Sequence, residues 1–150
     1  MPDKTMKTLV NVSVLAVLLV VAPSRCSALM EIEFVSKERA KELGIELRLK
    51  PNGPNDVWVE LEFKAEGELK GFSHVSLEIR EGDKLLLGWA RLREERLDSG
   101  SIVIHFLANR AYLDKITLSV VEGVPTAETG HELRVKDFVP KEMLQPIPNR

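Results

Sequence analysis

The sequence contains one cysteine, Cys26, and residues 29–150 contain none. That part of the chain therefore has no internal disulfide bond, no thiol nucleophile and no thiolate ligand for a metal. A domain without such cross-links depends on an apolar core for its stability. Roughly 120 residues are enough to build one.

An excess of positive charge is also absent. The chain has 21 basic and 23 acidic residues and a formal net charge of -2. Residues 1–28 are themselves basic, so the remainder is more acidic than the whole chain. Nucleic acids and anionic lipid headgroups both attract basic surfaces. The composition therefore argues against nucleic acid as a partner and against electrostatic docking on a membrane.

Motifs that position catalytic groups are missing too. The sequence has no Gly-x-Ser-x-Gly elbow, no His-Glu-x-x-His and no glycine-rich phosphate loop. Ser73 precedes His74, but adjacent strand residues point to opposite faces, so we expect no hydrogen-bonded nucleophile and base there. We therefore assign no catalytic residue.

Three pairs of glutamates stand two residues apart, at Glu31/Glu33, Glu60/Glu62 and Glu66/Glu68. On a strand, such a pair puts two carboxylates side by side, as a glycosidase requires. A solvated strand face has the same appearance, and we interpret Glu60 and Glu62 in that way.

The three histidines are His74, His105 and His131, and none is close to another in the sequence. A metal site needs several such ligands to converge. We expect one exposed histidine on a strand, one half-buried histidine and one in a loop, and we assign no metal or cofactor site.

The N-terminal segment, residues 1–28, is typical of a cleaved signal peptide. Lys4 and Lys7 precede an apolar stretch at 9–22, and Cys26-Ser27-Ala28 supplies small residues for cleavage. The apolar stretch is shorter than the roughly 20 residues that span a bilayer. The alternatives are an uncleaved anchor and a buried helix. The pattern predicts a secreted, periplasmic or cell-envelope protein with no stable membrane span after cleavage.

Residues 57–65 show the clearest strand pattern in the chain. Apolar and polar side chains alternate, which is typical of a strand with one buried face. The expected inward row is Val57, Val59, Leu61, Phe63 and Ala65. The same reasoning predicts further strands at 30–35, 45–50, 72–80, 84–93, 101–108, 114–122 and 132–139.

The segments between these strands are expected to be turns, with one exception. Ser36, Glu38 and Gly44 indicate a short helix directly after the first strand. We expect a long polar loop at 123–130 and an extended, proline-containing tail at 140–150. The strand at 84–93 is apolar on both faces, which favours a central position in a sheet or a cover provided by the helix.

About seven or eight short strands with regular turns predict an all-β fold in a single domain at 29–139. The rhythm resembles that of immunoglobulin-like and fibronectin-like domains, which implies an antiparallel β-sandwich. A small open β-barrel of the lipocalin type is the competing fold.

Trp58 and Trp89 are the candidate interaction residues. Trp58 lies on the polar face of its strand, where it could contact a sugar ring or an apolar side chain of a partner. We expect instead that the helix at 37–43 or the C-terminal tail covers it. The favoured function is an exported, non-enzymatic module that binds a protein or glycan or has a structural role. The alternatives are a carrier of a small apolar ligand and a hydrolase with a carboxylate site.

If residues 1–28 are a signal peptide, the exported protein should begin near Leu29 and contain no thiol. N-terminal sequencing and thiol titration of the exported material measure both. Recovery of intact Met1 from that material would contradict the prediction.

Overall fold

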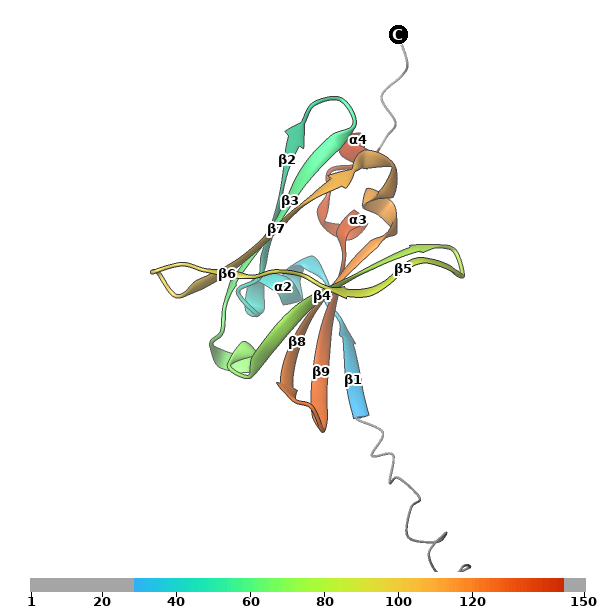
Figure 1. The fold of residues 1–150 in the computed structure, drawn as a ribbon. Coiled ribbons are helices and arrows are strands. Elements are labelled where there is room, and N and C mark those ends of the chain that lie inside the picture. Colours follow the sequence, from blue (N-terminus) through green and yellow to red (C-terminus); the bar gives the residue numbers. More distant parts are fainter. Residues whose placement is uncertain (1–28, 145–150) are drawn as a thin grey trace, which may run out of the picture.

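The structure is a computed structural model that describes residues 29–144 and is mainly β (Figure 1). Its strands form two sheets, and within the described residues no strand pairing closes them into a barrel. The five-stranded sheet contains, in order, β1 (Leu29–Phe34), β9 (Ala127–Arg134), β8 (Ile116–Val124), β4 (Phe72–Glu81) and β5 (Lys84–Arg91). The four-stranded sheet contains β2 (Glu46–Asn52), β3 (Asp56–Lys64), β7 (Ser101–Asn109) and β6 (Glu95–Arg96).

The apolar faces of the two sheets share one core. The predicted inward row of β3 is confirmed from Val57 to Phe63, whose four apolar side chains are at most 1% exposed. The five-stranded sheet contributes Leu118 and Leu133 to the same cluster. The ring of Phe63 meets Phe72 of β4 edge to face, with 5.0 Å between the ring centroids. Burial of these rows is the main source of stability.

Short helices connect the strands and close the ends of the core. The helix α2 (Lys37–Glu42) follows β1, and the Ser36 hydroxyl accepts a hydrogen bond from the Arg39 backbone N–H at its start. Ala40 and Leu43 join the core. The other helices are η1 (Gly67–Leu69), η2 (Arg110–Lys115), α3 (Val135–Phe138) and α4 (Lys141–Leu144).

The first strand differs from the antiparallel arrangement that the strand rhythm predicts. β1 pairs in parallel with β9, from Leu29 beside Ala127 to Phe34 beside Glu132. The chain leaves β1 through α2 and enters the other sheet, so no hairpin partner follows β1. The last strand of the chain takes that place instead.

The expected loop at 123–130 was wrong. β8 continues to Val124 and β9 begins at Ala127, so the two strands form a tight hairpin. Gly123 permits this geometry, because its φ is 106° and a Cβ atom there would lie 2.3 Å from the Ala127 carbonyl oxygen. The expected strand at 132–139 is correspondingly displaced. It ends at Arg134, and α3 follows.

The expected central position of the strand at 84–93 was also wrong. β5 lies at the edge of its sheet and pairs only with β4 among the described strands. Its register against β4 shifts around Leu87, which places Gly88 in an irregular, bulged segment. Two apolar faces on this strand therefore mark an exposed edge instead of a buried centre.

The expected tail at 140–150 is partly helical. Residues 141–144 form α4, and Met143 and Leu144 pack against the core. Residues 145–150 and the predicted signal peptide at 1–28 lie outside the described residues. No helix among the described residues has the length and apolar character needed to cross a membrane.

Replacing Phe63 by alanine should lower the free energy of unfolding by about 3–5 kcal/mol, because the side chain is fully buried between the two sheets. The control is Glu60→Ala on the other face of the same strand. It loses only partly exposed ion pairs and should cost less than about 1 kcal/mol. Equal losses in urea denaturation would show that the two faces of β3 are assigned incorrectly.

Candidate interaction surface

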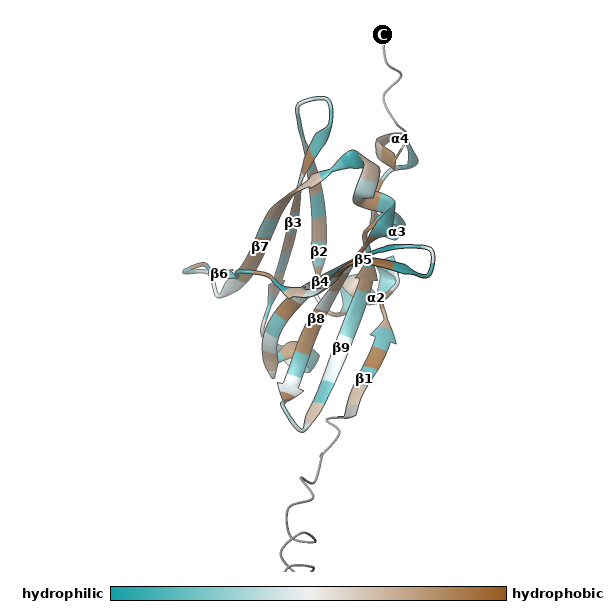
Figure 2. Cartoon of the chain, turned by 45° about the vertical axis from the view of Figure 1, so that its right-hand side comes forward, coloured by the Kyte–Doolittle hydropathy of each residue, from teal (hydrophilic) through white to brown (hydrophobic). Residues whose placement is uncertain are grey.

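The edge strand β5 exposes the largest continuous group of apolar side chains on one described element. Leu85 and Trp89 are 49% and 47% exposed, and Leu86 and Leu87 lie between them with similar exposure. Figure 2 shows a hydrophobic stretch on β5, in the projecting β4–β5 hairpin. Apolar side chains gathered in this way on a surface are typical of interaction sites.

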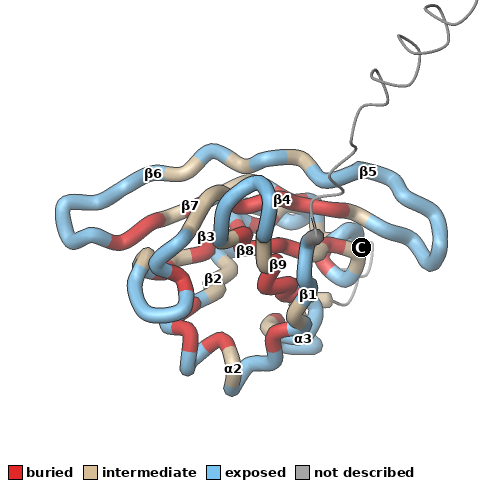
Figure 3. Tube along the Cα trace, turned by 90° about the horizontal axis from the view of Figure 1, so that it is seen from below, coloured by how far each residue is buried: buried red, intermediate tan, exposed pale blue. Residues whose placement is uncertain are grey.

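The exposed edge extends beyond β5. The Leu92 backbone N–H donates to the Val75 carbonyl oxygen at 2.8 Å, so residues that follow β5 remain beside β4. The chain then enters β6, where Glu95 pairs with Val103 of β7. Figure 3 shows the resulting line of exposed chain along one side of both sheets. A single run of sequence thus borders the two sheets.

The outward backbone of β5 is available for pairing. Within the described part of the chain, only β4 pairs with it, so the groups directed away from β4 have no strand partner. Native edge strands usually limit such pairing by bulges or charged residues. β5 has a bulge and carries Lys84 and Arg91 at its two ends, but the segment between them is uncharged.

Trp58 lies on the outer face of the four-stranded sheet and is 40% exposed. The expectation that helix 37–43 covers it was wrong, because Ala40 of that helix packs into the core on the opposite side of β3. Trp58 pairs across strands with Leu107, and its ring meets His105 edge to face with centroids 6.0 Å apart. Its strand is paired on both sides, unlike that of Trp89.

The glutamate pairs noted in the sequence form ion pairs with arginines. Arg48 Nη1 lies 2.9 Å from a carboxylate oxygen of Glu60 and 2.9 Å from one of Glu62. In the second cluster, Arg39 lies 2.7 Å from Glu33 and 2.5 Å from Glu68. These contacts hold Glu33, Glu60, Glu62 and Glu68 in partly exposed ion pairs, so at least one member of each sequence pair is bound to an arginine.

His131 is buried on β9, whereas a loop position was expected. Its Nδ1 atom lies 2.7 Å from Glu33 Oε2, and Arg39 Nε binds the other oxygen of the same carboxylate. The Arg39 hydrogen bond is the main reason that the pKa of Glu33 is lowered, and His131 adds to the effect. The network connects β1, α2 and β9, which makes it a structural connection between the ends of the chain.

Ser73 and His74 contact each other, contrary to the expectation from strand alternation. Ser73 Oγ lies 3.1 Å from His74 Nδ1. The β4–β8 register shifts between Phe72 and His74, so this segment of β4 does not alternate regularly. His105 lies on the other sheet and is exposed, so the histidines of β4 and β7 do not converge.

A further pair of carboxylates, which the sequence did not indicate, lies on the outer face of the five-stranded sheet. Glu132 and Glu78 are both buried, and Glu78 also binds Arg80. Burial raises the pKa of Glu132, and the charge of Glu78 adds to that rise. Ser119, opposite Glu132 on β8, is fully buried, and its hydroxyl has no partner among the described residues.

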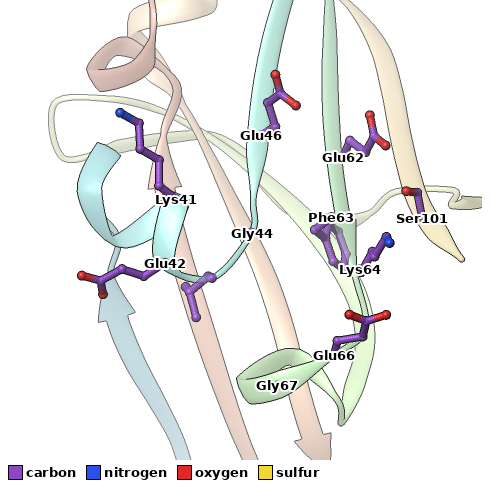
Figure 4. A pocket seen from close by; sticks show the side chains of 11 residues that line it. Lys41, Glu42, Gly44, Glu46, Glu62, Phe63, Lys64, Glu66, Gly67 and Ser101 are labelled. Atoms are coloured by element: carbon purple, nitrogen blue, oxygen red, sulfur yellow. The ribbon is translucent and has the colours of Figure 1, made fainter.

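The described cavities are open and lined by charged side chains. One of about 400 Å³ lies between the end of α2 and strands β2 and β3, and Figure 4 shows Lys41, Glu46, Glu62 and Lys64 around it. Another of about 390 Å³ lies beside His105 and includes residues 93–95. Carriers of apolar ligands use mostly apolar pockets, so these cavities do not favour that function.

Comparisons with protein-family models, with curated proteins and with solved structures find no match to this chain.

The raised pKa of Glu132 predicts a pH dependence of stability. A carboxyl whose folded pKa lies above its ordinary value of 4.5 stabilises the protein at low pH, and this contribution is lost as pH rises through the raised pKa. Glu132→Gln should therefore gain stability relative to wild type as the pH rises above the ordinary carboxyl pKa of 4.5. Urea midpoints measure the change, with the less buried Glu128→Gln as control. A difference that is independent of pH would contradict the prediction.

Proposed function

We propose that this chain is an exported, non-enzymatic binding module, an immunoglobulin-like β-sandwich whose edge strand β5 receives an extended segment of a partner protein. Export is supported by the signal-peptide pattern at 1–28. The sandwich is supported by two sheets that share one core. The observation that carries the binding function is the exposed apolar edge formed by β5.

Strand addition uses the two resources that β5 provides. The unpaired backbone groups supply hydrogen bonds that are independent of the partner's sequence. The exposed side chains from Leu85 to Trp89 supply apolar contacts that favour particular partners. Replacing a buried tryptophan in such an interface by alanine typically costs about 2 kcal/mol or more of binding free energy. Trp89 is therefore the expected anchor.

A glycan is the second candidate ligand, and it would bind elsewhere. Trp58 exposes an aromatic ring beside His105, and the cavity of about 390 Å³ lies next to the same histidine. Exposed tryptophan rings are suited to stacking against sugars. The geometry favours β5, because its backbone is open, whereas β3 is paired along both sides.

The two tryptophans form a matched pair for testing the proposal. Peptides selected from a displayed random library on the exported protein provide the probe. Trp89→Ala should weaken binding of the selected peptides by about thirtyfold, as expected for the loss of about 2 kcal/mol. Trp58→Ala should leave their affinity within about twofold. Isothermal calorimetry measures both variants.

Hydrogen exchange then locates the bound peptide. Backbone amides of β5 should gain protection on binding, because strand addition pairs them directly. A proline in the centre of the selected peptide should abolish binding. Protection confined to the Trp58 face, or binding lost only in Trp58→Ala, would favour the second candidate and overturn the first.

A further inference from the structure

Within residues 29–144, neither edge strand of the five-stranded sheet has a second strand partner, and the charged residues on the two edges are of opposite sign. β1 has the sequence Leu-Met-Glu-Ile-Glu-Phe, with two acidic residues and no basic one. β5 has the sequence Lys-Leu-Leu-Leu-Gly-Trp-Ala-Arg, with two basic residues and no acidic one. Each strand pairs on one side only among the described residues.

β1 is also apolar on its exposed face. Met30, Ile32 and Phe34 alternate along the strand, and Ile32 and Phe34 are 51% and 68% exposed. This row is of the same kind as the apolar segment of β5 at the opposite edge. The two edges are thus matched in apolar character and complementary in charge.

We propose that the chain associates head to tail with a second copy of itself, with β1 of one copy adding to β5 of the next; this inference rests on the proposed function of β5. Charge selects this pairing over the alternatives. Two β5 strands side by side bring together four positive charges. Two β1 strands bring together their Glu31 carboxylates, since Glu33 is already paired with Arg39. Like charges on neighbouring strands are destabilising, whereas β1 beside β5 brings Glu31 next to a strand that carries two basic residues.

The strand directions agree with this junction. β1 runs parallel to β9, and three antiparallel pairings then lead through β8 and β4 to β5. β1 and β5 therefore run in opposite directions within one sheet. A second copy added in the same orientation places its β1 antiparallel to β5 of the first. Antiparallel pairing is slightly more stable per residue than parallel pairing.

A junction between two different edges has a consequence for the size of the assembly. A row of joined copies still presents a free β1 at one end and a free β5 at the other. Such heterologous contacts produce rings or open chains instead of closed dimers. The mass of the assembly should therefore rise with concentration beyond that of a dimer.

Sedimentation velocity of the exported protein tests the junction with one block on each edge. Ile32→Lys places a charge on β1, and Leu87→Lys places one on β5; both positions are exposed. Each variant alone should sediment as a monomer, because every junction needs both edges. An equal mixture should form a single 1:1 complex, because one intact β1 and one intact β5 remain. Val124→Lys, on the central strand β8, is the control and should assemble as wild type does.

A charge swap tests the selectivity. Glu31→Lys alone, and Lys84→Glu with Arg91→Glu, should each weaken association by about tenfold or more. In the chain that carries all three changes, the side chain introduced by Glu31→Lys again lies beside opposite charge on β5, so its association should be stronger than that of the Lys84→Glu/Arg91→Glu chain. Recovery distinguishes complementarity from a loss of folding, which circular dichroism monitors separately.

Two outcomes overturn the proposal: a wild-type protein that stays monomeric at all concentrations, and an Ile32→Lys variant that still dimerises through β5. If the monomeric protein nevertheless binds selected peptides along β5, only the self-association fails. If it neither associates nor binds peptides, the proposed function of β5 fails as well.

Discussion

The burial of one alternating row on β3 is the constraint on which the rest of the structure depends. A strand with one apolar face needs an opposing layer that buries this face, and the five-stranded sheet supplies that layer. Phe63 and Phe72 join the layers where the strands are close. The short helix α2 closes one end of the core with Ala40 and Leu43. The outer faces and the sheet edges are then the surfaces left for other molecules.

The sequence predicted the elements with regular alternation and failed where alternation was masked. β3 and β7 were predicted nearly to the residue, because both have one buried and one solvated face. The β8–β9 hairpin was missed, because polar residues on its outer face resemble a loop. Pairing partners were missed as well, since alternation describes the faces of a strand and says nothing about its neighbours. The parallel β1–β9 pair follows from topology alone.

For the same reason, the sequence did not reveal that the candidate interaction strand lies at a sheet edge. Three consecutive leucines and a tryptophan on one strand were interpreted as a central strand or as one covered by the helix, because apolar residues on both faces usually mean burial. Lys84 and Arg91 at its ends were the available signal for an edge, since charged residues often protect edge strands. Glu132 gave no signal at all. Its raised pKa depends on neighbours from other strands, which only the fold brings together.

The parallel pairing of β1 with β9 determines how the domain bears mechanical load. Leu29 lies beside the start of β9, whereas the chain leaves β9 at Arg134, at the opposite end of the pair. In Figure 1, β1 begins at one end of the molecule and α4 lies at the other. Tension between residue 29 and Leu144 therefore shears β1 along β9. It loads the evenly spaced hydrogen bonds of the pair together instead of opening them one by one.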